Sequence, residues 1–278
     1  MLPWISVDAL RARLGDPDLR LVDVRSVLGR PGAGRAAFEA GHLPGAAFLD
    51  LERDLSGPIG VHGGRHPLPD PSALAATFGA VGIGAGTHVV AYDAGDAMVA
   101  GRVWWSLRWL GHDAVQVLDG GFAAWVAAGG PVTTEGAVHA PARLEPRPRP
   151  EMLVDRADLI AGSGDPGRVV VDARAAERYR GDVEPLDPRA GHVPGAVNYP
   201  YAENLEGGRF RAPAALRERF AALAAAREVV VYCGSGVSAA HDLMALEAAG
   251  IHGAKLYAGS WSDWVSYPDA AVALGAEP

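Results

Sequence analysis

The chain repeats itself, and this feature constrains its fold more than any other. Four short segments occur in the same order in both halves. They are LVDVR at 21–25 with VVDAR at 170–174, GHLPGA at 41–46 with GHVPGA at 191–196, VVAYD at 89–93 with VVVYC at 229–233, and LDGGFAAW at 118–125 with YAGSWSDW at 257–264. The copies are offset by 149 or 150 residues in the first two pairs and by 140 or 139 in the last two. We therefore expect two copies of one fold, with about ten extra residues in the first copy between 46 and 89.

A proline-rich segment, PVTTEGAVHAPARLEPRPRP at 131–150, separates the two copies. Segments of this composition run extended over a protein surface. We therefore expect a first domain at 1–136, a linker at 137–150 and a second domain at 151–278. The length of 278 residues suits two domains of ordinary size.

Within each copy, short β-branched apolar runs alternate with alanine- and leucine-rich helical patterns. The runs lie at 21–24, 89–92, 169–172 and 229–232, and the helical patterns lie at 72–78, 99–110, 214–226 and 238–249. This alternation predicts an α/β fold in which each copy forms a mainly parallel sheet flanked by helices. Ligands in such folds bind outside the carboxyl ends of the strands.

The chain's only cysteine, Cys233, stands between the run at 229–232 and a glycine-rich turn, in VVYCGSGVSAA. If Ser238 begins a helix, the thiol lies at the ligand-binding end of the sheet. Gly234 and Gly236 then allow several backbone N–H groups to face one point, where the helix N-terminus adds partial positive charge. Such a turn favours the nucleophilic thiolate. The alternatives are a buried structural cysteine and a Ser238 that only caps the helix.

Composition argues against several classes of function. The 25 Lys and Arg residues against 33 Asp and Glu give a net charge of −8, which disfavours nucleic acid as a partner. No stretch approaches the roughly 20 apolar residues that span a bilayer, and the N-terminus does not resemble a signal peptide, so we expect a cytoplasmic protein. A single cysteine permits no intrachain disulfide. His62 and His66 lie in a Gly/Pro-rich loop and are poor metal candidates, so we expect neither a metal nor a cofactor.

CGSGVS at 233–238 resembles the active-site loop of the two-domain rhodanese-like sulfurtransferases, in the 3-mercaptopyruvate sulfurtransferase branch, which typically has CGSGVT. Thiosulfate-preferring members have a loop similar to CRKGVT. The resemblance covers essentially the whole chain, including both GHxPGA segments and DARAAERYRG at 172–181. In the first copy Asp93 takes the place of the cysteine, which implies a catalytically silent domain.

The resemblance implies a persulfide cycle. The Cys233 thiolate would take a sulfane sulfur from a small-molecule donor, 3-mercaptopyruvate, and release pyruvate. No second cysteine exists to resolve the persulfide. The acceptor must therefore be external: cyanide, a small thiol or a thioredoxin-like protein. We expect a monomer, because the two copies can cover each other.

The resemblance also implies which residues form the site. The loop residues are Ser235, catalytic together with Cys233, and Gly234, Gly236, Val237 and Ser238, which bind the substrate. The substrate-binding arginine of the family matches Arg178 in RYRG. A second family arginine matches Arg189 only with shifted spacing, and Arg180 is a possible substitute. Arginine suits a carboxylate substrate because its planar fork binds both oxygens; a surface charge or a structural ion pair is the alternative reading of each arginine.

Two residues of the first copy complete the implied site. Asp50 in FLDL and His66 before PLP match a family aspartate and histidine that assist proton transfer at the domain interface. The alternatives are loop capping for Asp50 and surface exposure for His66. Asp23 and Asp172, by contrast, are expected to bond loop amides at strand ends.

Other enzyme classes fit less well. A cysteine phosphatase needs an arginine six positions after its cysteine, where this chain has Ala239, and neither Ser235 nor Ser260 has the flanking glycines of a hydrolase elbow. Two alternatives stay open. One is thiosulfate:cyanide sulfurtransferase activity at the same site, and the other is a non-catalytic sulfur-carrier or binding module.

Overall fold

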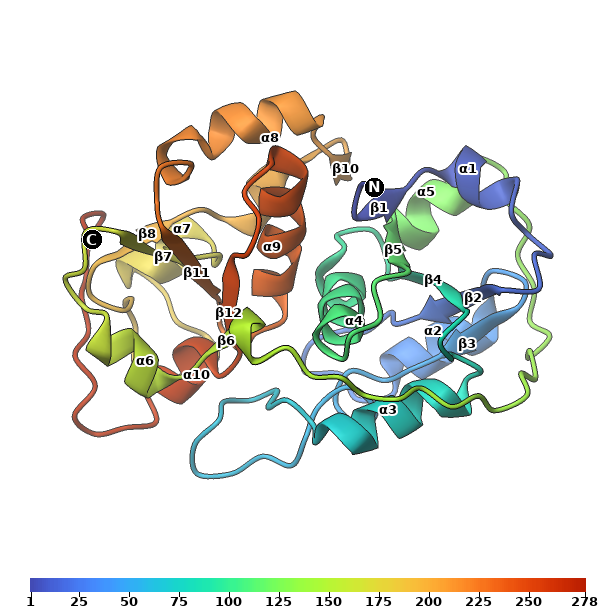
Figure 1. Cartoon of the computed structure of the whole chain (residues 1–278), viewed down its shortest axis with the longest axis horizontal. Helices are drawn as coiled ribbons and strands as arrows, with labels where there is room; N and C mark the ends of the chain where they lie inside the picture. The colour runs from blue at the N-terminus through green and yellow to red at the C-terminus, as the bar shows by residue number, and fades with distance from the viewer. The chain divides into compact units, whose positions relative to one another are not determined.

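The computed structural model describes residues 1–278, which divide into two units that largely follow the two repeats (Figure 1). The first unit contains Met1–Gly57, Pro69–Arg149 and Gly207–Phe210, and the second contains Pro58–Leu68, Pro150–Glu206 and Arg211–Pro278. Each half of the chain therefore contributes one short segment to the unit formed mainly by the other half.

The first unit is built on a five-stranded parallel sheet with strand order β1-β5-β4-β2-β3. Its strands are β1 (Trp4–Ile5), β2 (Leu19–Asp23), β3 (Ala46–Phe48), β4 (His88–Tyr92) and β5 (Val115–Leu118). Its helices are α1 (Val7–Arg11), α2 (Ala33–Ala40), α3 (Pro71–Ala80), α4 (Met98–Trp109) and α5 (Gly121–Ala127). Strands and helices alternate along the chain, as the sequence predicts.

The second unit repeats this arrangement, with strand order β6-β12-β11-β7-β8, again all parallel. The strands are β6 (Leu153–Val154), β7 (Arg168–Asp172), β8 (Ala196–Asn198), β11 (Glu228–Tyr232) and β12 (Lys255–Tyr257). The helices are α6 (Arg156–Ala161), α7 (Ala176–Arg180), α8 (Pro213–Arg219), α9 (Ser238–Ala249) and α10 (Ser260–Trp264), with short 3₁₀ turns η1 (Pro150–Met152), η2 (Tyr201–Asn204) and η3 (Ala221–Leu223). The short strand β9 (Leu205–Glu206) is additional, and the strand that follows it, β10 (Arg209–Phe210), belongs to the first unit. The predicted fold, two tandem α/β domains with parallel sheets, is confirmed.

The predicted elements agree with the observed ones within one or two residues, with one exception. The helix predicted at 214–226 is wrong at its end, because α8 stops at Arg219 and the 3₁₀ turn η3 follows. Phe220 leaves helical backbone geometry (φ −93°, ψ 13°) and is fully buried. Packing of this aromatic ring therefore ends a helix that alanine propensity alone would continue.

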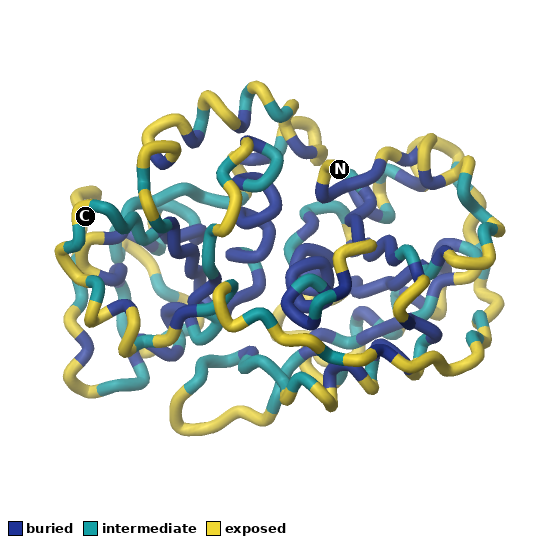
Figure 2. The backbone as a smooth tube through the Cα atoms, in the orientation of Figure 1, coloured by how far each residue is buried: buried dark blue, intermediate teal, exposed yellow.

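Buried residues are concentrated in the sheets and in α4 and α9, the helices that follow the central strands β4 and β11 (Figure 2). Strands buried on both faces read as continuous apolar runs, which is why both runs were recognisable in the sequence. None of the helices combines the length and apolar character needed to cross a lipid bilayer.

The repeated motifs make the same contacts in both units. Asp23 accepts the Arg25 backbone N–H at 3.0 Å, and Asp172 accepts the Arg174 backbone N–H at 2.9 Å. Both aspartates also pair with the side chain of that arginine. The predicted role of Asp23 and Asp172, bonding loop amides at strand ends, is confirmed.

The proline-rich segment that precedes the second repeat packs against the first unit. The Ala142 N–H donates to the Gly79 carbonyl and the Arg149 N–H donates to the Trp109 carbonyl, each at 2.9 Å. Leu144 is buried. Residues 134–149 form no helix or strand, and these hydrogen bonds attach their backbone to the rest of the first unit.

Candidate active site

Cys233 lies in the loop that connects the central strand β11 to the buried helix α9. The loop takes five residues from the end of the strand at Tyr232 to the start of the helix at Ser238. Gly236 adopts a left-handed conformation (φ +76°), which glycine takes without strain, and its N–H points at the cysteine sulfur with an N–Sγ distance of 3.1 Å. The loop therefore wraps backbone donors around the sulfur.

These donors stabilise the thiolate. Cys233 is 2% exposed, and burial alone would raise the pKa of its thiol. Hydrogen bonds from the Ser238 hydroxyl and from the backbone N–H groups of Ser235, Ala239 and Gly236 outweigh that effect, so the pKa is lowered. Val237, not Ser238, is the N-cap residue of α9, which leaves the Ser238 hydroxyl for the sulfur. The surroundings of the thiol are polar, unlike those of a structural cysteine in an apolar core.

A serine–histidine pair lies in the same loop. His66 Nδ1 is 2.7 Å from Ser235 Oγ, and the two side chains are 5% and 7% exposed. The alternative reading of His66 as a surface side chain is therefore wrong. Segment Pro58–Leu68, which carries His66, belongs to the second unit although it comes from the first repeat.

Two arginines converge on Gly234, next to Cys233. A methyl group in place of the Gly234 hydrogen would lie 3.0 Å from Arg65 Nη2 and 3.4 Å from Arg178 Nη1. Arg65 forms an ion pair with Asp187, and Arg178 pairs with Glu184 at 2.6 Å and with Asp187 at 3.4 Å. Sequence reasoning predicted Arg178 but missed Arg65. The available signal was its place directly before His66.

The carboxylates that hold these arginines carry shifted pKa values. Burial would raise the pKa of Glu184, but hydrogen bonds from Arg178 and the Leu186 N–H, with the charge of Arg174, lower it. Burial raises the pKa of Asp187 despite its contacts with Arg65 and Arg178. The arginines are thus held in place by neighbouring acids and are already largely neutralised.

The other two candidate arginines have different surroundings. Arg180 pairs with Asp182 at 2.7 Å, and its side chain is 40% exposed. The Arg189 carbonyl accepts the Trp261 indole N–H at 2.9 Å, while its side chain makes no hydrogen bond or ion pair. A substrate-binding role for either arginine stays a prediction.

Ser260, at the start of α10, is a further residue of the site that sequence reasoning missed. Its hydroxyl accepts the Cys233 backbone N–H at 3.1 Å, donates to the Tyr257 carbonyl at 2.9 Å and lies 3.9 Å from the Cys233 sulfur. Its backbone is left-handed (φ +56°), which strains a residue other than glycine. Ser260 therefore combines a strained backbone with a hydroxyl that contacts the cysteine.

In the first unit, Asp93 occupies the position of the cysteine and fills the corresponding ring of amides with its own carboxylate. Oδ1 accepts the N–H groups of Gly95 and Ala97 at 3.0 and 3.1 Å, and Oδ2 accepts that of Ala100 at 3.2 Å. Burial, together with the charge of Asp96, raises the pKa of Asp93 to about 7. The first repeat therefore retains the anion-binding loop but has no sulfur in it.

Asp50 makes only local contacts in the first unit. Its Oδ1 accepts the backbone N–H groups of Glu52 and Arg53 at 3.0 and 3.1 Å, which is the loop-capping arrangement. Its predicted part in proton transfer stays a prediction. No group of three or more His, Cys, Asp or Glu side chains is arranged as a metal ion would require.

Comparison with known proteins agrees with this geometry. The family model for the rhodanese-like domain matches the chain twice, at residues 6–128 and 155–267. The chain is 48% identical over 278 residues to a Pseudomonas aeruginosa protein named "Probable 3-mercaptopyruvate sulfurtransferase", with 98% of each chain covered. It is 41% identical to a Mycobacterium tuberculosis protein, SseB, whose name refers to thiosulfate sulfurtransferase activity, with 94% of this chain and 92% of that one covered.

Among solved structures, the crystal structure of SseA from Escherichia coli, described as a 3-mercaptopyruvate sulfotransferase with the rhodanese fold, aligns with a TM-score of 0.83. The two sequences are 32% identical, and the alignment covers 94% of this chain and all of the other. The repeat, the fold and these matches lead to one conclusion. The chain belongs to the rhodanese-like family and carries two rhodanese-like domains.

Proposed function

We propose that this protein is a sulfurtransferase that moves a sulfane sulfur from 3-mercaptopyruvate to an external acceptor through a persulfide on Cys233. The observation that carries the proposal is the loop around the sulfur, in which Gly236 N–H donates to Sγ at 3.1 Å and the thiol pKa is lowered despite burial. A thiolate is the attacking form of cysteine, and a persulfide is an anion of similar kind one atom longer.

In the first half of the cycle, the Cys233 thiolate attacks the sulfur of 3-mercaptopyruvate. The new S–S bond forms while the C–S bond breaks, and the electron pair of that bond stays on carbon as the enolate of pyruvate. The proton of the substrate thiol moves to the enolate carbon. The products are pyruvate and the Cys233 persulfide anion, so charge and protons balance.

The His66–Ser235 pair is suited to carry that proton. The pair is buried, its hydrogen bond is short at 2.7 Å, and Ser235 is two residues from Cys233. A histidine next to a hydroxyl can accept a proton on one atom and return it from another. We assign the proton transfer to this pair, with Asp50 as a further candidate.

The arginine pair is suited to the carboxylate of the substrate. Arg65 and Arg178 reach the Gly234 position from different segments, next in sequence to the reactive Cys233, and a guanidinium group can bind both oxygens of a carboxylate. Glycine at 234 lets both guanidinium groups approach the loop, since even a methyl group there would crowd them. The lining acids, Glu184 and Asp187, offset much of the positive charge, which favours a singly charged carboxylate over a dianion such as thiosulfate.

In the second half of the cycle, an acceptor nucleophile attacks the outer sulfur of the persulfide. The S–S bond breaks, its electrons return to Cys233 as thiolate, and the acceptor leaves with the sulfur. Cys233 is the only cysteine of the chain, so no internal thiol can take the sulfur. Cyanide, a small thiol or a thioredoxin-like protein would serve. Asp93, which stands in place of a cysteine, supports the prediction that the first domain has no catalytic activity. That the protein is a cytoplasmic monomer stays a prediction.

Thiosulfate as donor is the second candidate, since two arginines beside the cysteine could hold a dianion. Steady-state kinetics with cyanide as the common acceptor separates the two. We expect kcat/KM to be at least about tenfold higher with 3-mercaptopyruvate than with thiosulfate. A higher kcat/KM with thiosulfate would make thiosulfate the preferred donor. Cys233→Ala is the control and should abolish activity with both donors. A Cys233→Ala variant with full activity would refute the persulfide route, and a parent that binds sulfur without turnover would indicate a carrier module.

A further inference from the structure

The segment Pro58–Leu68 is the part of the first repeat that carries Arg65 and His66, and it lies within 46–89, the stretch in which the first copy has about ten extra residues. It has no helix or strand of its own and exposes Ile59 and Val61 near its start. Nothing in its own backbone therefore fixes where its two functional side chains lie. Contacts with residues 259–267 of the second unit do this, together with the Arg65–Asp187 ion pair and the His66–Ser235 hydrogen bond.

Hydrogen bonds and one ring contact fasten the segment. The Gly63 N–H donates to Asp263 Oδ1 at 2.6 Å, and the Arg65 N–H donates to Ser262 Oγ at 3.1 Å. The His62 ring stacks on Tyr267 with 3.8 Å between ring centroids and 5° between planes. These contacts lie on the N-terminal side of His66 and within four residues of it.

His62 also makes a hydrogen bond through its ring. Its Nδ1 lies 2.7 Å from Ser266 Oγ. The Ser266 hydroxyl donates to the Asp263 carbonyl at 2.6 Å, so its oxygen accepts the hydrogen from His62 Nδ1. His62, Ser266 and Asp263 thus form one connected network.

The close approach also explains the glycine at 64. Gly64 is left-handed (φ +81°), and a methyl group there would lie 2.4 Å from the Gly259 carbonyl oxygen. Only glycine permits both the turn and the contact. Gly64 in the GGRH sequence at 63–66 therefore allows the segment to pack closely against Gly259.

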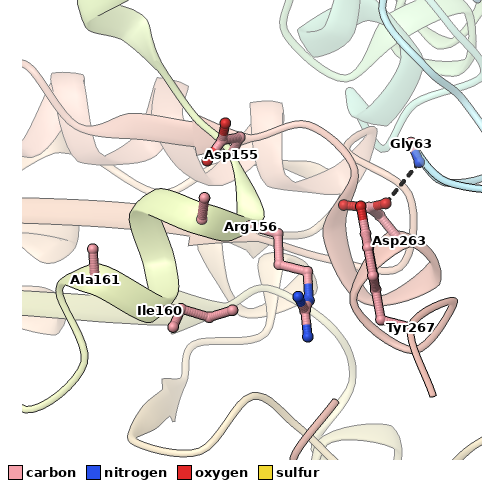
Figure 3. Close-up of a pocket in the computed structure, with 8 residues that line it drawn as sticks. Gly63, Asp155, Arg156, Ile160, Ala161, Asp263 and Tyr267 are labelled. Carbon is pink, nitrogen blue, oxygen red and sulfur yellow. Dashed lines mark hydrogen bonds between the residues drawn. The ribbon is translucent and has the colours of Figure 1, made fainter. Parts of the chain in front are cut away.

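Asp263, which accepts the Gly63 N–H, is 6% exposed. A cavity of about 580 Å³ opens beside it, and Figure 3 shows the Asp263 carboxylate directed at the Gly63 N–H on one side of this cavity. Its lining residues are Gly63, Asp155, Arg156, Ala157, Ile160, Ala161, Asp263 and Tyr267. Loss of one contact with residues 259–267 should therefore loosen the part of the segment before His66, although the Arg65–Asp187 ion pair and the His66–Ser235 hydrogen bond remain.

We propose that Pro58–Leu68 is a strap whose attachment to residues 259–267 sets the rate at which Cys233 takes up sulfur, with His62 and Asp263 as positioning residues. The inference rests on the proposed function, because the reactivity in question is that of Cys233. Neither residue need touch the substrate. They act by holding Arg65 and His66 in place.

The test is His62→Ala, which removes the stack and the hydrogen bond of an exposed side chain. We expect kcat/KM for 3-mercaptopyruvate to fall about fivefold, with both a higher KM and a lower kcat, because the arginine and the histidine loosen together. His62→Phe keeps the stack and should recover most of the loss. His252→Ala, which removes an exposed histidine that makes no hydrogen bond, is the matched control and should leave the kinetics unchanged.

Two further measurements separate positioning from general stability. Hydrogen exchange of the peptide covering 58–68 should be faster in His62→Ala, because a loosened segment breaks the hydrogen bonds of the Gly63 and Arg65 amides more often. In a His66→Ala background, His62→Ala should cost clearly less than in the parent, since one of the groups it positions is gone. Unchanged kinetics in His62→Ala, or the same loss in the His66→Ala background as in the parent, would contradict the proposal of a strap. The proposed function would still stand, because the parent enzyme remains active. A parent that takes up no sulfur would overturn the proposed function itself.

Discussion

At the residue scale, the reactivity of Cys233 depends on the balance between burial and hydrogen bonding. Burial opposes the thiolate, while one hydroxyl and several amides favour it. Of the groups that lower the thiol pKa, the Ser238 side chain has the largest effect. The amides are fixed by the fold, but this hydroxyl can be removed by a single substitution.

Ser238→Ala should therefore raise the pKa of Cys233. The rate of alkylation by iodoacetamide, measured against pH, reports the fraction of thiolate. We expect its midpoint to move to higher pH and the rate at neutral pH to fall. Ser238→Thr keeps the hydroxyl and serves as the control, with a midpoint near that of the parent. An unshifted midpoint in Ser238→Ala would mean that the amides alone set the pKa.

Ser260 also contacts Cys233, and it does so from a strained backbone conformation. Its φ of +56° matches the φ of +54° at Gly121, which stands at the corresponding position of the first repeat. Glycine adopts this geometry freely, whereas serine is strained there by about 1 kcal/mol or more. The second copy accepts the strain and gains a hydroxyl beside the sulfur.

Ser260→Gly and Ser260→Ala separate the two effects. Both remove the hydroxyl, so both should slow persulfide formation. Ser260→Gly relieves the strain and should have an unfolding free energy about 1 kcal/mol higher than that of Ser260→Ala, as measured by urea denaturation. Equal stabilities would show that the left-handed backbone carries no strain at this site.

At the element scale, the same strand–loop–helix unit serves two purposes in one chain. After β11 it surrounds a thiol, and after β4 it surrounds the carboxylate of Asp93. The backbone N–H groups can donate to either anion, but the Asp93 carboxylate is buried and lies near Asp96. Its pKa of about 7 therefore lies well above the ordinary value of 3.8.

This shift predicts a pH dependence of stability. Since the folded-state pKa is raised, the folded protein binds the Asp93 proton more tightly than the unfolded chain does. The contribution to the unfolding free energy is fully present below about pH 4 and is lost as the pH rises to about 7. In Asp93→Asn the unfolding free energy should decline less steeply over this range. Asp8→Asn, whose side chain is 93% exposed in the parent, should keep the parent's slope, and an Asp93→Asn slope equal to it would contradict the shift.

At the scale of the whole molecule, the repeat predicted the fold because strands buried on both faces leave continuous apolar runs. It also predicted the cysteine loop, because glycine spacing and strand–helix order are local properties. The exchange of Pro58–Leu68 and Gly207–Phe210 between the units could not be predicted in this way. It depends on contacts such as His62 on Tyr267 and Phe210 on Trp4, which are distant in sequence. Arg65 was missed for the same reason, since its partner Asp187 is 122 residues away.

The most direct test of the account is the intact mass of the protein after reaction with 3-mercaptopyruvate in the absence of an acceptor. We predict one added sulfur atom per chain, located on the peptide that contains Cys233, with one pyruvate released for each sulfur gained. Cyanide should then remove the sulfur and restore the original mass. Pyruvate release without added sulfur, or sulfur on any other residue, would contradict the account.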